Sequence, residues 1–236
     1  MPNQSDHHIS HRYDQELEAL RDDVLSMGSK VEEQIENAVR ALTEGDDELA
    51  DATIREDHGL NAMEVAADEK AVSLLARRTP AARDLRFVMT AIKTITDLER
   101  MGDEAEKIAR MAKRLNTRKP LKRYLSLPAM SEAVRNQTRQ ALDCLAAMDD
   151  EAAQRVHAED AKVDEMFEGI FRELLTYMME DPRTISDTIE ILFVAKALER
   201  IGDHSKNITE YVIYMVHGQD VRHTDIDQLY LEDREE

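Results

Sequence analysis

Residues that interrupt helices are scarce in this sequence. Its 236 residues include only 7 Gly and 5 Pro, and the aromatic residues are 6 Tyr, 4 Phe and no Trp. Charged residues make up 34% of the chain. Few turn-forming residues combined with many charged ones are typical of long helices. The composition therefore predicts an all-α protein, long enough for two modest domains or one large domain.

A single cysteine and the absence of long apolar runs narrow the class of protein further. Cys144 is the only cysteine, so an intramolecular disulfide is excluded and a reducing compartment is favoured. Its neighbours Ala141, Leu145 and Met148 indicate an ordinary packed thiol. No apolar run approaches the ~20 residues that a transmembrane helix needs, and the polar N-terminus does not resemble a signal peptide. We therefore expect a cytoplasmic protein that does not insert into membranes.

Positive charge is in the minority. The chain has 31 Lys and Arg against 50 Asp and Glu, which gives a formal net charge of −19. This balance argues against direct binding of nucleic acid and suits the binding of cations. The segment 107–123 is the exception, with eight Lys or Arg and no acid. We interpret it as a helix end that favours cations followed by an interdomain linker, with a docking patch for a partner as the alternative.

One hexapeptide occurs twice. Residues 98–103 read Leu-Glu-Arg-Met-Gly-Asp, and residues 198–203 read Leu-Glu-Arg-Ile-Gly-Asp. Three segments with helical periodicity surround each copy: 13–44, 47–78 and 80–115 in the first half, then 129–148, 149–179 and 182–217 in the second. Long helices joined by short loops predict antiparallel bundles. We therefore expect two pseudo-symmetric antiparallel three-helix bundles, at 10–117 and 118–220, with flexible tails at 1–9 and 221–236.

The expected helix ends follow from capping residues. Gly45 should end the first helix and Asp46 should cap the second. Thr79 should cap the third helix, with Pro80 at its first position. Asp149 should cap the fifth helix, and Asp181-Pro182 should begin the sixth in the same way.

In each half an apolar stripe leads into a pair of carboxylates. Residues three and four apart share one helix face, so the pattern predicts that these acids lie on the core side of the helix. The first stripe is Leu85, Met89, Ile92 and Thr96 before Glu99 and Asp103; the second is Ile185, Ile189 and Leu192 before Glu199 and Asp203.

A buried carboxylate without a partner is costly, and both copies also keep a helix-weakening glycine, Gly102 and Gly202. A bound cation would compensate for these costs. The alternative is that Glu99 and Glu199 pair with arginines of neighbouring helices, while the glycines allow close helix packing.

The middle helix of each half supplies further oxygen ligands. Asp57, Asn61 and Glu64 are expected to face Glu99 and Asp103. Asp68 continues that helix face, but we assign it to solvent.

In the second half, Asp160 and Asp164 are expected to face Glu199 and Asp203. Oxygen ligands select hard cations such as magnesium, manganese or iron, and more than one ion per site is compatible with so many carboxylates. The Glu-x-x-His pairs of di-iron enzymes are missing, as are a nucleotide-binding loop and a catalytic triad. We therefore expect a protein that is not an enzyme, with a metal-dependent helical enzyme or a metal store as the alternative.

The doubled hexapeptide resembles the signature of the PhoU family of bacterial phosphate-uptake regulators. Residues 80–86, 177–181 and 218–223 are also similar to that family, and the similarity runs from about Ile9 to Arg222. The resemblance implies two symmetric three-helix bundles, often in a homodimer. It also implies iron, zinc, manganese or magnesium ions held by Glu99 with Asp103, Glu199 with Asp203, and Asp160 with Asp164. The pair in the first half departs from the pattern, because Asn61 follows Asp57, and its neutral amide predicts a weaker first site.

The same resemblance implies a role and partners. A PhoU protein is expected to act in the cytoplasm, between the ATPase subunit of the phosphate importer and the sensor histidine kinase of the phosphate-starvation response. It would keep the kinase quiet and restrain uptake when phosphate is plentiful. We expect the exposed faces of the first and fourth helices to dock on these partners.

Overall fold

The computed structural model describes residues 4–77, 80–117 and 126–221, and these form six long α-helices without any strand. The short 3₁₀ helix η1 (Pro182–Thr184) precedes the last of them. The helices are α1 (Gln4–Glu44), α2 (Asp47–Arg77), α3 (Ala82–Asn116), α4 (Leu127–Ala147), α5 (Asp150–Glu180) and α6 (Ile185–His217). The predicted all-α class and the six long helices are confirmed.

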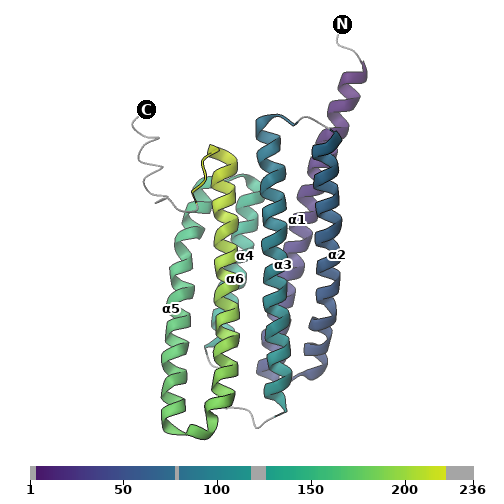
Figure 1. The fold of residues 1–236 in the computed structure, drawn as a ribbon. Coiled ribbons are helices and arrows are strands. Elements are labelled where there is room, and N and C mark those ends of the chain that lie inside the picture. The colour runs from purple at the N-terminus through teal and green to yellow at the C-terminus, as the bar shows by residue number, and fades with distance from the viewer. Residues whose placement is uncertain (1–3, 78–79, 118–125, 222–236) are drawn as a thin grey trace, which may run out of the picture.

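The helices form two antiparallel groups of three that pack side by side (Figure 1). Helices α1, α2 and α3 contact one another, and so do α4, α5 and α6. The groups meet where α3 packs on α6 and α1 packs on α4. In Figure 1, α3 begins at the upper end of the molecule and α6 begins at the lower end. This is the arrangement expected from a duplicated unit. The exact limits of the two units at 10, 117 and 220 stay predictions.

The hydrophobic face of α1 lies where its periodicity predicts. Seven apolar residues at helical spacing along α1 are at most 2% exposed, and Leu17 packs partly buried against them. Each such large side chain contributes about 1.5–3 kcal/mol when it leaves water. The seven are Leu20, Val24, Met27, Val31, Ile35, Ala38 and Leu42.

The predicted core faces of α3 and α6 are wrong. Leu85 and Met89 are 43% and 39% exposed, and Ile185 and Ile189 are 40% and 39% exposed. The innermost side chains of α3 belong to a neighbouring stripe, Val88, Ala91, Ile95 and Leu98. Because α3 packs on α1, α2 and α6 at once, its sequence is apolar on several faces. Periodicity alone does not identify the deepest of them.

Most of the expected helix ends are correct. The carboxylate of Asp46 accepts a hydrogen bond from Leu49 N at 2.9 Å, and that of Asp149 accepts one from Ala152 N at 2.8 Å. Asp181 caps η1 by accepting from Arg183 N at 3.1 Å. The start expected at Pro80 is wrong, because α3 begins at Ala82; Thr79 lies outside the described residues.

The ends of the chain require one further correction. Helix α1 begins at Gln4 rather than near position 13, so residues 4–9, expected to be a loose tail, are helical. Residues 222–236 and 118–125 lie outside the described part of the chain. The C-terminal tail and the basic linker therefore stay predictions.

Two glycines with open space around them provide a test of backbone conformation. Gly45 follows α1 with a φ of +72°, whereas Gly169 lies inside α5, and neither would place an added Cβ within 4 Å of another atom. Gly45→Ala should lower the free energy of unfolding by about 1 kcal/mol, since an L residue is strained at positive φ. Gly169→Ala should raise it by about 0.5–1 kcal/mol, because alanine favours the helix. Urea denaturation measures both, and equal signs would contradict the assignment.

Candidate metal-binding site

The predicted ligands of the first half lie together on the outer side of α2 and α3. Asp57 is only 5% exposed, and one of its oxygens, Oδ2, accepts a hydrogen bond from Asn61 Nδ2 at 3.2 Å. Glu64, Glu99 and Asp103 are half-buried around it. The first carboxylate cluster is Asp57, Asn61, Glu64, Glu99 and Asp103.

Three of these carboxylates, Asp57, Glu64 and Glu99, have raised pKa values. Desolvation raises the pKa of Glu99, and the charges of Asp103, Glu64 and Asp57 raise it further. The pKa of Glu64 rises for the same reasons, through burial and the charge of its neighbours. Desolvation is also the main cause of the raised pKa of Asp57. The direction of all three shifts shows that negative charge is poorly compensated here.

Gly102 brings α3 close to its neighbours beside this cluster. A Cβ at Gly102 would lie 2.1 Å from Leu60 Cδ2, 3.2 Å from Gln34 Oε1 and 3.5 Å from Asp57 Oδ1. The glycine therefore leaves room for a glutamine from α1 and an aspartate from α2 to reach the backbone of α3. Close helix packing at the glycines, which was one of the two alternatives, is confirmed.

The second half repeats the arrangement with different partners. Asp160 is 3% exposed and accepts from Gln137 Nε2 at 3.1 Å, while Lys206 Nζ lies 3.1 Å from its other oxygen. Lys196 Nζ lies 2.5 Å from Glu199 Oε1. The second carboxylate cluster is Asp160, Asp164, Glu199 and Asp203.

Two members of the second carboxylate cluster lie at its surface. Asp164 and Asp203 are exposed. Even so, partial desolvation raises the pKa of both, and so do neighbouring carboxylates: Asp160 and Glu199 for Asp164, Glu199 and Asp160 for Asp203. The positive charge of Lys196 opposes this effect and lowers the pKa of both Asp164 and Asp203. The ligands predicted for each half are thus brought together.

Sequence reasoning missed four residues of these sites. The glutamines Gln34 and Gln137 are 2% and 3% exposed and occupy matching places on α1 and α4. Lys196 and Lys206 lie among the acids of the second half, and the first half has no lysine at the matching positions. All four are ordinary surface residues of a helix by type, so periodicity gives no signal for them. Comparison of matching positions in the two halves would have found them.

Two further interpretations of single acids are corrected. Among the described residues no arginine of a neighbouring helix pairs with Glu99 or Glu199; instead Arg200 Nη1 on α6 lies 3.3 Å from Glu104 Oε1 on α3. Asp68, assigned above to solvent, is half-buried, and its Oδ1 is buried without a hydrogen-bond partner.

The first carboxylate cluster fits a hard cation. Asp57 Oδ1, Asn61 Oδ1 and Gln34 Oε1 are buried oxygens without a hydrogen-bond partner, and oxygen ligands are what magnesium and manganese prefer. No three His, Cys, Asp or Glu side chains in the described residues are already gathered closely enough to hold one ion. The cluster is thus a group of neighbouring ligands rather than a preformed coordination shell. A bound ion would supply positive charge that these carboxylates otherwise lack.

A groove between α3 and α6 joins the two motif copies. Its volume is about 400 Å³, and its lining includes Arg100 and Asp103 from the first copy and Arg200 and Asp203 from the second. At its floor, His204 Nδ1 lies 2.8 Å from an oxygen of Asp97, which is 2% exposed. Each positive group of the groove already lies near an acid: Arg100 and His204 near Asp97, and Lys107 and Arg200 near Glu104.

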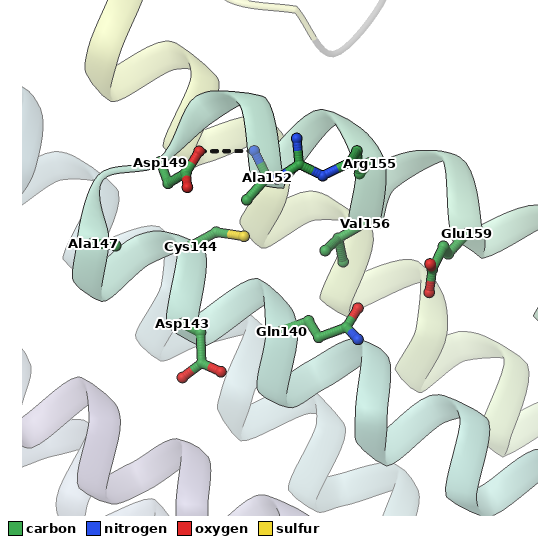
Figure 2. Close-up of a pocket in the computed structure, with 9 residues that line it drawn as sticks. All are labelled: Gln140, Asp143, Cys144, Ala147, Asp149, Ala152, Arg155, Val156 and Glu159. Atoms are coloured by element: carbon green, nitrogen blue, oxygen red, sulfur yellow. Dashed lines mark hydrogen bonds between the residues drawn. The ribbon is translucent and has the colours of Figure 1, made fainter.

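A second hollow, of about 410 Å³, lies between α4 and α5 (Figure 2). Figure 2 shows Cys144 beside Val156 and the capping residue Asp149. The thiol is 4% exposed. Burial, together with the charges of Asp149 and Asp143, raises its pKa to about 11. Because a thiol of this kind stays protonated at neutral pH, it is not a nucleophile. The predicted packed thiol is confirmed.

The chain matches a known family over most of its length. The family model described as "PhoU domain" matches twice, at residues 24–112 and 127–212. A Pseudomonas putida protein named "Phosphate-specific transport system accessory protein PhoU homolog" is 45% identical over 227 residues, which cover 96% of this chain and 89% of that protein.

Two solved structures have the same fold. The crystal structure of PhoU from Pseudomonas aeruginosa superposes with a TM-score of 0.84 at 43% identity, covering 88% of this chain and 100% of that one. That of the phosphate transport system regulatory protein PhoU from Streptococcus pneumoniae gives a TM-score of 0.82 at 28% identity, covering 89% and 99%. The names describe accessory and regulatory proteins and no enzyme, in agreement with the expectation from the sequence.

Gly102→Ala should destabilise the protein more than Gly202→Ala. The new Cβ at Gly102 would meet Leu60, which is fully buried and has no room to turn, whereas at Gly202 the nearest atom, Val163 Cγ1, lies 3.2 Å away. Overpacking costs about 1–3 kcal/mol, partly offset by the higher helix propensity of alanine. Chemical denaturation compares the two variants, and a smaller loss for Gly102→Ala would contradict the packing described.

Cys144 should react slowly with a thiol reagent in the folded protein. The raised pKa and the burial of the thiol both oppose formation of an accessible thiolate. Absorbance after addition of Ellman's reagent at pH 7.5 should rise at least about a hundredfold more slowly than after unfolding in guanidinium, since the thiol pKa of about 11 in the folded protein lies about 2 units above its ordinary value of 9.0. Equal rates would show that the hollow opens freely.

Proposed function

The chain belongs to the PhoU family, and from this premise we propose that it is a negative regulator of the phosphate-starvation response and of phosphate uptake. At the coarser level it is an accessory protein of phosphate transport, as its relatives are named. The finer proposal is that it acts as a metal-binding adaptor between the ATPase subunit of a phosphate importer and a sensor histidine kinase. It works in the cytoplasm, and as a homodimer.

The observation that carries the proposal is the match over nearly the whole chain to phosphate-transport accessory proteins. Both halves take part, because the family model matches each of them separately. A relative of similar fold is named a regulatory protein. In the described residues no helix is long and apolar enough to cross a membrane.

The exposed apolar side chains favour a docking surface other than the one expected. The sequence pointed to the exposed faces of α1 and α4, but these two helices pack on each other. Among the residues with described side chains, large exposed apolar groups belong to α2, α3, α5 and α6 instead. They are Val65, Val72, Leu85, Met89, Phe171, Leu175, Met179, Ile185, Ile189, Phe193 and Val216. Exposed apolar groups of this kind commonly mark interaction sites, so we assign docking to these helices.

Bound metal has a defined place in this proposal. A ligand changes docking only if it binds one state of the protein more tightly than another. The carboxylate clusters and the exposed apolar residues share two helices, since Met89 and Glu99 both belong to α3 and Ile189 and Glu199 both belong to α6. Neutralising the clusters would therefore change the charge of the surface on which a partner docks.

Deletion of the gene should derepress the phosphate-starvation response in phosphate-rich medium. Alkaline phosphatase activity in the source bacterium should rise at least about tenfold, the effect expected if a loss of repression equals about 1.4 kcal/mol of regulatory coupling or more. A plasmid copy of the gene should restore low activity.

A docking variant serves as the matched test of the surface. Leu85→Glu with Met89→Glu should fail to restore low activity, whereas Gly169→Ala, an exposed change on α5 away from these side chains, should restore it. Unchanged phosphatase activity after deletion would overturn the regulatory role and would favour a metal store or a metal-dependent enzyme.

A further inference from the structure

The two carboxylate clusters have different positive partners, although their backbones match. When the two hexapeptides are aligned, Lys196 and Lys206 of α6 stand where α3 has Thr96 and Glu106. When Asp57 of α2 is aligned with Asp160 of α5, Phe167 stands where α2 has Glu64, and Lys196 Nζ lies 5.4 Å from the centre of the Phe167 ring. The second cluster thus contains two ammonium groups held in place, whereas the first has none at the matching positions.

The difference extends to an acid and a base four residues apart beside each cluster, which stand in opposite order in the two halves. On α3, Arg110 donates to Glu106 at 2.5 Å, and Glu106 is one of the charges that raise the pKa of Asp57. On α6, the matching positions are Lys206 and Glu210, and Lys206 lies 3.1 Å from Asp160. In the first half the acid, Glu106, lies near the buried Asp57 and repels its charge. In the second half the base, Lys206, lies near the buried Asp160 and attracts its charge.

The two buried aspartates show the result. Both oxygens of Asp160 have partners, one in Gln137 and the other in Lys206. Asp57 has one partner, the amide of Asn61, and its Oδ1 is buried without any. This orphaned oxygen and Gln34 Oε1 both point at the α3 backbone beside Asp103, as their distances from a Cβ on Gly102 indicate. In the second cluster, Glu199 Oε2 and Gln137 Oε1 remain without partners.

We infer that the two halves are unequal cation sites: the first carboxylate cluster takes a hard divalent cation from solution, whereas the second carries its own cations in Lys196 and Lys206. This rests on the proposed metal-binding function and deepens it. It reverses the expectation from the sequence, in which Asn61 made the first site the weaker one. Asn61 instead supplies a neutral oxygen next to Asp57 without adding to the repulsion.

Ion pairs hold both lysines of the second cluster in place. Lys206 Nζ lies 3.1 Å from Asp160 Oδ2, and Lys196 Nζ lies 2.5 Å from Glu199 Oε1. An added cation in this half would have to compete with ammonium groups that the chain itself supplies. Such tethered charges compete at high effective concentration.

Titration of the metal-free full-length chain with Mn²⁺, followed by electron paramagnetic resonance, tests the inference. Wild-type protein should show one tight class of sites. Glu99→Gln with Asp103→Asn should weaken that class at least about tenfold. The matched pair in the other half, Glu199→Gln with Asp203→Asn, should change it less than about twofold.

An exchange of residues between the halves tests the cause. Lys196→Thr, Lys206→Glu and Glu210→Arg together give the second half the residues that the first half has at these three positions, and should add a second tight class of Mn²⁺ sites. Circular dichroism melting establishes that each variant is folded. Equal weakening by the two matched pairs, or no added class in the folded exchange variant, would overturn the inequality while leaving metal binding intact. Absence of Mn²⁺ binding to wild-type protein would overturn metal binding as well, and the phosphatase experiment would remain as the separate test of the regulatory role.

Discussion

A carboxylate packed against a helix bundle needs a positive charge or hydrogen-bond donors around it, and much of this structure follows from that constraint. Asp57 and Asp160 are both almost fully buried. Asp160 accepts a hydrogen bond from Gln137 of α4, whereas Gln34 of α1 lies beside the same glycine as Asp57. Each aspartate thus lies beside a glycine that allows the close approach of the helices. The glycines therefore serve the polar contacts as much as the apolar packing. The fold fixes the positions of the buried acids, and the residues around them determine how their charge is compensated.

Duplication has preserved packing more strictly than charge. The innermost residues of α3 and α6 correspond closely, as at Leu98 and Leu198, which are both fully buried. The residues around the acids do not correspond, since Glu106 beside the first cluster is matched by Lys206 beside the second. Side chains at the edge of a cluster contact few core atoms, so their charge is free to change without altering the bundle. Two sites of equal backbone geometry can in this way acquire different affinities.

The helices, their order and most of their ends could be predicted from the sequence, because α1 has a single buried face and capping residues act locally. The buried face of α3 could not, since three neighbours surround that helix and several apolar stripes overlap. Gln34 and Gln137 were missed because a glutamine on a helix is usually solvated, and only the tertiary arrangement buries it. Whether Glu99 and Glu199 pair with arginines and whether the glycines allow close helix packing likewise required the distances between helices.

The opposite directions of α3 and α6 have a consequence for how the molecule is reached from outside. Leu85 stands near the start of α3 and Ile185 at the start of α6, and these helices begin at opposite ends of the molecule (Figure 1). A helix of 35 residues such as α3 is about 50 Å long. Under the proposed adaptor function, partners that docked at these two ends would contact separate parts of the surface. Binding of one partner would then leave the other end of the molecule accessible to the second.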